Sequence, residues 1–422
     1  MVVGGGIVGA ATAYHAARRG ARVILVEKGA VGGEQSGRAW GFVRRHGRPP
    51  AAMALMAGAG RVWDGLSTEL EADIELVREG NLAVAETPAD VVRLEEGHRA
   101  ARGAGVPSRL LTGAEVRALV PGMRGDWKGG LYSAEDGHAE PLAVTTAFAR
   151  AARKLGADVW ERCVALRIDT HGGRVCAVET DCGRVEAPHV VAAGGVWTQR
   201  LVEPLGIRLP LRVVRSSAAA TRPGPPVTGL GVWGPRVAFR QRATGHFYLG
   251  NGYRGVAAEH DLTLASLRHL RFFLPSYREN WRLLRLRVGR HLLADVVHRF
   301  RGSPRARFSS GPWAAARASR SAIRSLEREF RGIFPHLAGL RVERAWAGFI
   351  ELTPDLLPIL GPVQELRGLQ LAVAAGHGFS MGPVIGRLLA EAAVAGRSSL
   401  DLSPFRPSRF WDGPLEVPRK IL

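Results

Sequence analysis

Three glycines near the start of the chain have the type and spacing that dinucleotide binding requires. Gly4, Gly6 and Gly9 form a Gly-x-Gly-x-x-Gly pattern, and Glu27 follows at the end of the next apolar run. One glycine makes the tight turn, one lets the backbone approach a pyrophosphate, and one lets helix and strand pack closely. The acidic side chain accepts hydrogen bonds from ribose hydroxyls. Because a carboxylate there disfavours a 2′-phosphate, the pattern predicts FAD or NAD rather than NADP.

The residues around these glycines form a complete βαβ unit. Val2 and Val3 lead into the turn, the Ala-rich segment from Ala10 to Arg19 has helical composition, and a second apolar run covers Val23 to Val26. The start of the helix supplies free N–H groups and a positive dipole end for phosphates. Because strand, glycines, helix, strand and acid occur in this order, dinucleotide binding is favoured over a glycine-rich turn in another kind of α/β unit.

Composition limits the classes of protein that the chain can belong to. With 422 residues, two domains with two cores are expected. The formal charge of +20 would suit a nucleic-acid partner. However, 54 of the 58 basic residues are Arg, and such a preference for Arg over Lys reflects the base composition of the genome rather than a surface selected to bind nucleic acid. No nucleic-acid-binding motif is present, so nucleic acid is not expected as a partner.

The cysteines and the apolar runs indicate a cytoplasmic protein. Cys163, Cys176 and Cys182 lack the spacing of a zinc site, so free thiols and no metal are predicted. Free thiols suit a reducing compartment. No run is long and apolar enough for a spanning helix, and no signal peptide is expected at the start.

Four further segments carry a resemblance to a known family. They are 191–197 (VAAGGVW), 346–349 (WAGF), 353–361 (TPDLLPILG) and 375–383 (AGHGFSMGP). Together with the N-terminal unit, they resemble the D-amino-acid oxidase family of FAD-dependent oxidoreductases, in the branch of glycine oxidase, sarcosine oxidase and D-amino-acid dehydrogenase. The resemblance spans nearly the whole chain, and its C-terminal motifs are the more specific part.

The resemblance implies a fold and a domain organisation. The fold class would be α/β, or α+β overall, with a Rossmann-like FAD-binding domain and an inserted antiparallel-sheet substrate domain. The FAD-binding domain would comprise residues 1–77, 139–209 and 343–422, and the substrate domain residues 78–138 and 210–342. The spacing of apolar residues also predicts helices over 52–70, 88–103, 142–155, 262–300 and 319–330. Trp63 is expected in the core, and His138, in a polar turn, is expected to be solvated.

The resemblance also implies which residues hold the cofactor. FAD would be bound without a covalent link, because sarcosine oxidase attaches its flavin through a Cys near the W-x-G motif and this chain has no Cys after Cys182. Val164 would touch the adenine through its backbone, and backbone N–H groups after His377 would face the pyrimidine end of the flavin. The cofactor-binding residues would be Gly4, Gly6, Gly9, Glu27, Lys28, Ser36, Arg38, Ala39, Gly41, Phe42, Val164, Gly194, Gly195, Trp197, Gly348, Gly378, Phe379, Ser380 and Met381.

The candidate catalytic residues are Arg44, Tyr248 and Ser380. Ser380 stands where sarcosine oxidases have a Lys that binds the substrate carboxylate. Ile350 and Glu351 stand where glycine oxidases have an Arg with the same task. This leaves Arg44, with Arg45 and Arg48 beside it, as the carboxylate clamp, and a solvated arginine is the alternative. Tyr248 aligns with the Lys that promotes oxygen reaction in sarcosine oxidase.

The predicted function is oxidation of the C–N bond of an amino acid or N-substituted amino acid to an imine that hydrolyses, by oxidative deamination or dealkylation. Oxygen, a quinone or a partner protein would accept the electrons. One alternative is a flavoprotein subunit that passes electrons to a partner subunit or a membrane quinone, and another is an NAD-linked reductase. Residues 282–299 alternate Leu and Val with Arg, which favours packing on the core over peripheral contact with the inner face of the membrane.

Overall fold

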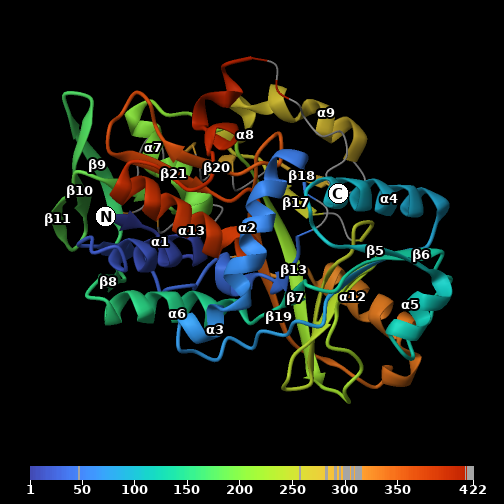
Figure 1. Cartoon of the computed structure of the whole chain (residues 1–422). Coiled ribbons are helices and arrows are strands. Elements are labelled where there is room, and N and C mark those ends of the chain that lie inside the picture. The colour runs from blue at the N-terminus through green and yellow to red at the C-terminus, as the bar shows by residue number, and fades with distance from the viewer. Residues whose placement is uncertain are drawn as a thin grey trace.

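Two large sheets organise the computed structural model, which describes residues 1–45, 48–255, 258–280, 284–288, 292–293, 296–297, 305, 308, 316–413 and 415. A six-stranded sheet with helices α1, α6 and α13 lies on the left of Figure 1. A ten-stranded sheet with helices α4, α5 and α12 lies on the right. The long strand β13 runs between these two groups of helices (Figure 1).

The six-stranded sheet contains the predicted βαβ unit at its centre. Its strands in spatial order are β20 (Ile359–Pro362), β21 (Leu369–Val373), β12 (Val190–Ala192), β1 (Val2–Val3), β2 (Ile24–Glu27) and β8 (Asp158–Glu161). All neighbours pair in parallel except β20, which is antiparallel to β21. Helix α1 (Ile7–Ala17) joins β1 to β2, so the predicted strand, turn, helix and strand are confirmed.

Helices cover one face of this sheet, where residues of α1, α2, α6 and α13 share a buried core with Leu25 and Val191. The other face packs on residues such as Ile168, Val178 and Leu201. Helix α1 packs against α13 (Gly378–Ala395) and α6 (Pro141–Lys154), and α2 (Met53–Asp64) packs against α13. Trp63 of α2 is fully buried, as predicted. Further described helices include α3 (Leu66–Glu69), α7 (Thr198–Val202), α8 (Leu264–Arg268) and α9 (Leu270–Asn280).

The larger sheet gathers strands from distant parts of the chain. Its order is β18 (Leu284–Arg287), β17 (Ala258–Asp261), β13 (Arg212–Pro223), β16 (His246–Asn251), β15 (Val237–Gln241), β14 (Gly231–Trp233), β4 (Asn81–Ala85), β6 (Gly129–Ser133) and β5 (Arg109–Thr112). Strand β19 (Val342–Leu352) pairs antiparallel with β13 along its whole length. Strand β19 therefore joins this sheet to the C-terminal strands β20 and β21 of the other sheet.

Smaller elements complete the fold. Strands β9 (Ala165–His171), β10 (Arg174–Thr180) and β11 (Gly183–Glu186) form a three-stranded sheet, and β3 (Phe42–Val43) pairs with β7 (Gly137–His138). Helices α4 (Pro88–Gly103), α5 (Gly113–Leu119) and α12 (Arg320–Ile333) cover the larger sheet. None of the described helices is long and apolar enough to cross a membrane.

Two predictions about local environment and structure were wrong. His138 is buried rather than solvated, because β7 pairs with β3 and its Nε2 lies 3.0 Å from the carbonyl oxygen of Gly229. Residues 284–287 form strand β18 within the predicted helix 262–300, because β17 offers them a free edge for pairing. Half of the residues 282–299 lie outside the described residues. Among the others, Leu286, Val288, Leu293 and Val297 are exposed, so the expected packing of this segment on the core is not seen there.

Candidate active site

A cavity of about 450 Å³ runs from the glycine turn after β1 to the strands of the larger sheet. At one end, which we call the nucleotide end, it is lined by Gly4, Gly6, Glu27, Lys28, Val164 and Gly194. At the other, which we call the distal end, it is lined by Arg44, Arg48, Asn81, Val214, Ser216, Trp233, Asn251, Tyr253 and Ala258. The loop 38–42, β19 and the start of α13 line it between these ends.

The three glycines of the turn differ in what surrounds them. Gly4 has φ +109°, and a Cβ there would lie 2.4 Å from the Ala193 carbonyl oxygen. A Cβ on Gly9 would lie 1.9 Å from the carbonyl oxygen of Gly4, so this glycine allows the close packing of helix and turn. A Cβ on Gly6 would meet only Ser36 Oγ, at 3.2 Å. Gly4 thus allows the bend of the turn, and Gly9 allows its close contact with the helix. Gly6 leaves an open backbone face toward the cavity, where a pyrophosphate could approach.

Glu27 is held at the nucleotide end by backbone donors. Its Oε2 accepts a hydrogen bond from Gly5 N at 2.7 Å, and its Oε1 accepts one from Gly29 N at 2.8 Å. Burial raises the pKa of Glu27, and these two N–H groups oppose that shift. Each carboxylate oxygen keeps a further lone pair. The carboxylate is therefore fixed in place with acceptor capacity left for ribose hydroxyls.

Lys28, Glu34 and Trp197 form a connected group beside Glu27. The Lys28 ammonium lies 3.9 Å from the centre of the Trp197 ring and pairs with the Glu34 carboxylate. Trp197 Nε1 donates to Glu34 Oε2 at 2.7 Å. The Val164 backbone N–H and carbonyl both pair with Asp181, so the predicted contact with adenine would use the second lone pair of that carbonyl.

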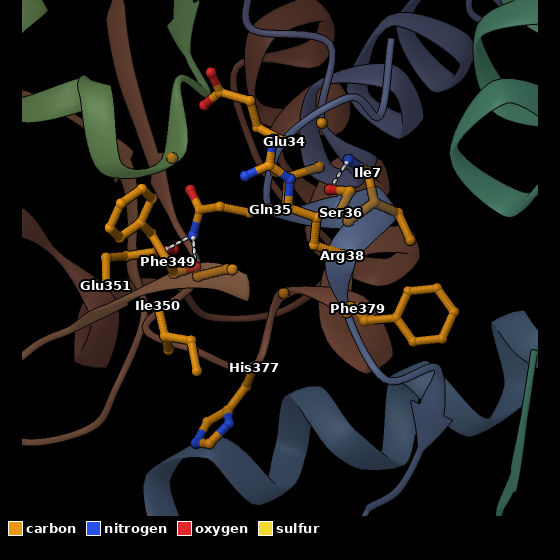
Figure 2. A pocket seen from close by; sticks show the side chains of 18 of the residues that line it. Ile7, Glu34, Gln35, Ser36, Arg38, Phe349, Ile350, Glu351, His377 and Phe379 are labelled. Carbon is orange, nitrogen blue, oxygen red and sulfur yellow. Dashed lines mark hydrogen bonds between the residues drawn. The ribbon is translucent and has the colours of Figure 1, made fainter. Parts of the chain in front are cut away.

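The loop after β2 is tied to two distant segments by Gln35. Its Nε2 donates to the Phe349 carbonyl at 3.2 Å and to the Glu351 carboxylate (Figure 2). Its Oε1 accepts a hydrogen bond from Val196 N at 2.9 Å. The next residue, Ser36, accepts a hydrogen bond from Ile7 N at 2.9 Å at the start of α1 (Figure 2). No motif marks Gln35, so sequence reasoning missed it.

The loop 38–42 is held from behind by a buried arginine. Arg240 Nε donates to the Trp40 carbonyl at 2.5 Å, and its Nη2 donates to Glu140 Oε2 at 3.1 Å. Trp346 Nε1 donates to the Arg38 carbonyl at 3.0 Å. The predicted residues Arg38, Ala39, Gly41, Phe42, Gly348, Gly378, Phe379 and Ser380 all line this middle part of the cavity.

Helix α13 begins at the cavity. His377 is its N-cap residue and makes no side-chain cap, so the first backbone N–H groups are open to a ligand. Burial, with Arg48 and Arg44 nearby, lowers the pKa of His377 well below its usual value, so the ring is neutral. The predicted residues Gly9 and Met381 are not among the lining residues; Met381 is fully buried behind them.

Arg44 and Arg45 are neighbours with opposite surroundings. Arg45 points at Asp136, with Nε 2.9 Å from Oδ1, and also pairs with Glu135 at 2.9 Å. Arg44 is 8% exposed, lines the cavity, and has its guanidinium 3.6 Å from the centre of the Trp233 ring. No described residue forms an ion pair with Arg44. Burial lowers its pKa well below the usual value, with Arg48 adding to the effect.

Tyr248 lies behind the cavity. Its hydroxyl accepts hydrogen bonds from Arg242 at 3.1 Å and Arg344 at 2.9 Å, and its ring meets Trp346 edge-on at 5.3 Å. It is not among the residues that line the cavity. Of the three predicted catalytic residues, the structure thus brings Arg44 and Ser380 to the cavity and leaves Tyr248 outside it.

Trp233 and Tyr253 were also missed by sequence reasoning. Trp233 meets Tyr253 edge-on at 5.9 Å, and the Tyr253 hydroxyl donates to the Val84 carbonyl at 2.7 Å. Arg93 lies 3.8 Å from the Tyr253 ring centre. These side chains come from separate elements of the larger sheet, and no sequence pattern marks them. His377, in contrast, lies in the GHGF motif and could have been predicted.

The fold also brings two cysteines and an aspartate close together, although Cys163 is distant from the other two residues in the sequence. The ligand atoms of Cys163, Asp181 and Cys182 lie within 4.8 Å of one another, although the spacing predicted no metal site. Asp181 already accepts from Val164 N at 2.7 Å and pairs with Arg305 at 3.2 Å. Its carboxylate is therefore engaged without a metal ion.

Comparison with known proteins agrees with this geometry. The family model described as "FAD dependent oxidoreductase" matches residues 1–392. Glycine oxidase of Bacillus licheniformis is 26% identical, over 93% of this chain and 91% of its own. The 4-methylaminobutanoate oxidase (formaldehyde-forming) of Paenarthrobacter nicotinovorans is 27% identical, over 97% of this chain and 45% of its own.

Solved structures show the same fold. L-amino acid deaminase from Proteus vulgaris superposes with a TM-score of 0.88 and 25% identity, over 97% of this chain and 96% of its own. The family model, the relatives and the shared fold all cover most of the chain and include the glycine turn, the C-terminal motifs and the cavity between them. The chain belongs to the DAO family of FAD-dependent oxidoreductases.

Proposed function

We propose that this protein oxidises the C–N bond of an amino acid or an N-substituted amino acid to an imine, which water then hydrolyses. One observation carries the proposal: Arg44 is a buried cation that faces the cavity and has no ion-pair partner among the described residues. Leaving a charge buried and unpaired is costly. A carboxylate ligand would remove that cost, and amino acids carry one.

The residues of the chain then have separate tasks. Bound FAD supplies a hydride acceptor, which the protein itself lacks. Arg44 would hold the substrate carboxylate through two N–H donors, and the Trp233 ring beneath it would keep the guanidinium plane fixed. The neutral His377 ring and the apolar side chains of Val214 and Ala258 at the distal end would exclude water from the reacting C–H. This orientation accounts for much of the rate enhancement expected of such a site.

The named activities of relatives support this assignment. Glycine oxidase and 4-methylaminobutanoate oxidase, by their names, oxidise an amino acid and an N-methylated amino acid. An NAD-linked reductase would not account for the family match or for the GHGF segment at the cavity. Residues 1–77, 139–209 and 343–422 would form the FAD-binding domain, and residues 78–138 and 210–342 the substrate domain.

The FAD would be bound without a covalent link. All three cysteines lie in the described part of the chain, and only Cys163 lines the cavity, beside Val164 at the nucleotide end. Acid precipitation of the yellow protein should therefore leave the flavin in the supernatant. A yellow pellet would contradict this part of the proposal.

A quinone or a partner protein would be the preferred electron acceptor. In support, Tyr248 stands where a relative's oxygen-promoting Lys would be, and it lies outside the cavity. The protein would act in the cytoplasm, and the exposed side chains of Leu286, Val288, Leu293 and Val297 support peripheral contact with the inner face of the membrane over packing on the core. Faster reduction of oxygen than of a quinone analogue would contradict this acceptor.

The experiment that tests the main proposal is anaerobic flavin bleaching. Purified holoenzyme is mixed with D- and L-amino acids, N-methyl amino acids, opines and cyclic imino acids, and flavin absorbance is followed without any acceptor. Loss of the flavin bands with members of this panel is expected. If no carboxylated amine bleaches the flavin, the proposal fails.

A further inference from the structure

The distal end of the cavity carries one excess positive charge. Arg44, Arg45 and Arg48 lie there together, facing buried Asp136 and half-exposed Glu135. Burial lowers the pKa of Arg48 to about 10, which leaves it charged at neutral pH. Arg93 also acts on Arg44 and has Asp90 near it, so four positive charges stand against three negative ones. This leaves room for a single ligand anion, and His377 adds no charge because its ring is neutral.

The carboxylates that line the cavity already form hydrogen bonds or ion pairs with other residues of the chain. Glu27 accepts from Gly5 and Gly29, Glu34 from Lys28 and Trp197, and Glu351 from Gln35. In Figure 2, Gln35 and Glu351 lie on one side, while Ile350 extends away from them toward His377. Among the described lining residues, the distal end therefore offers no carboxylate to a cationic side chain of a substrate.

An apolar wall faces this charged group. Val214 and Leu352 are buried and pack with Ala258, Ile350 and Leu356, and all five line the cavity. The wall comes from the neighbouring strands β13, β17 and β19 and from the loop after β19. Burying an apolar group of a ligand against it would be favourable in proportion to the area removed from water.

Leu356 reaches this wall through a strained backbone. Its φ is +58°, a conformation that branched residues rarely adopt. Arg409 holds the turn, with Nε 2.7 Å and Nη2 3.1 Å from the two oxygens of Asp355, and its Nη2 also donates to the Leu357 carbonyl at 3.0 Å. Strain of this kind persists only where surrounding contacts enforce it, and it gathers at functional sites.

We infer that the substrate is an amino acid with one carboxylate and an apolar side chain or N-substituent, and that Leu356 determines this specificity. The inference rests on the proposed function, since Arg44 must hold the carboxylate. The apolar group then packs on Val214, Ile350 and Leu356. A second carboxylate would give the distal end an excess negative charge, and an ammonium side chain would find no acceptor carboxylate.

The test compares, on the holoenzyme, amino acids whose side chains differ in charge and in apolar area. Bleaching rates are measured anaerobically for leucine and phenylalanine, for glutamate, for lysine and for glycine, in both configurations and with N-methyl forms. We expect kcat/KM for the apolar members to exceed that for glutamate and lysine by about 100-fold, because mismatched charge in a desolvated site costs several kcal/mol. Equal or better oxidation of glutamate or lysine would overturn the inference and leave the proposed function standing. No bleaching by any member would overturn both.

Two variants test the role of Leu356. Leu356→Asn keeps a residue that tolerates positive φ but removes the apolar group. We expect kcat/KM for leucine to fall about 10- to 100-fold, while that for glycine changes less than about 2-fold. Val214→Thr, which keeps the side-chain shape on a different element, should act in the same direction. Leu110→Asn, at an exposed Leu far from the cavity, is the matched control. If both wall variants keep the preference for leucine over glycine, the wall does not determine specificity.

Discussion

The two ends of the cavity recognise their ligands in different ways. At the nucleotide end, the turn from Gly4 to Gly9 and the carboxylate of Glu27 come from one continuous stretch and act largely through backbone groups. At the distal end, Arg44, Trp233 and Tyr253 come from three separate segments and act through side chains. Backbone recognition tolerates change in the surrounding side chains, whereas side-chain recognition can be altered one residue at a time.

The two ends also differ in how their charges are balanced. At the nucleotide end each charged group has a partner: Glu27 has two N–H donors, and Lys28 has Glu34. At the distal end Arg44 contacts the aromatic face of Trp233 and has no ion-pair partner among the described residues. A site whose charged groups are all paired before binding suits a ligand that never varies, such as a cofactor. A site with an unpaired charge selects a ligand of the opposite charge.

The largest effect should come from Glu27→Ala at the nucleotide end. This change removes the acceptor of two backbone N–H groups and of the ribose hydroxyls, each charge-assisted bond being worth about 1.5–3 kcal/mol. We expect the variant to purify largely as apoprotein, which the ratio of flavin to protein absorbance measures. Full flavin occupancy would show that the nucleotide end does not depend on this carboxylate.

The next effect should come from Arg44→Lys at the distal end. Lysine keeps the charge but loses the planar pair of donors and the stacking on Trp233, so we expect KM for a carboxylate substrate to rise about 10- to 100-fold. KM for the amide analogue, which lacks the anion, should change little. The paired variant Arg45→Lys is the control, because Arg45 points at Asp136. Equal effects on acid and amide would mean that Arg44 is not the clamp.

A smaller effect is expected from Trp233→Leu. The ring should contribute about 1–2 kcal/mol by stacking on the desolvated guanidinium, so KM for the acid should rise several-fold while kcat is nearly kept. Trp233→Phe should recover part of the loss, since it restores an aromatic face. A loss that Phe does not recover would indicate a merely structural role for this side chain.

An effect of another kind, on stability, lies outside both ends. Burial lowers the pKa of His15, His138 and His260 to about 3. The unfolded chain takes up protons below pH 6.5 that the folded chain does not, so stability is fully present above pH 6.5 and declines toward pH 3. Each His should contribute at most about 1.4 kcal/mol per pH unit.

His138→Gln checks this pH dependence. Glutamine keeps a donor for the Gly229 carbonyl but does not titrate, so the thermal midpoint of the variant should fall less steeply between pH 6.5 and 5. An unchanged slope would show that His138 is not held neutral in the folded state.

Local sequence determined the nucleotide end and much of the secondary structure. Helix α4 spans the predicted residues 88–103. The glycine pattern predicted the turn because a positive φ at Gly4 and the contact at Gly9 depend on the absence of a side chain there. Such features depend on residues close in the chain, so they can be predicted from their types and spacing.

Only the tertiary structure decided the distal end. The sequence favoured Arg44 over Arg45 and Arg48 as the carboxylate clamp, but the ion pair of Arg45 with Asp136 and the position of Arg44 on Trp233 depend on the tertiary structure. Trp233 and Tyr253 reach the cavity because β14 and β16 are paired through β15. His138 looked like a solvated turn residue and is buried, because β3 pairs with its strand. Burial and ion pairing depend on which distant segments meet, and residue types alone do not determine this.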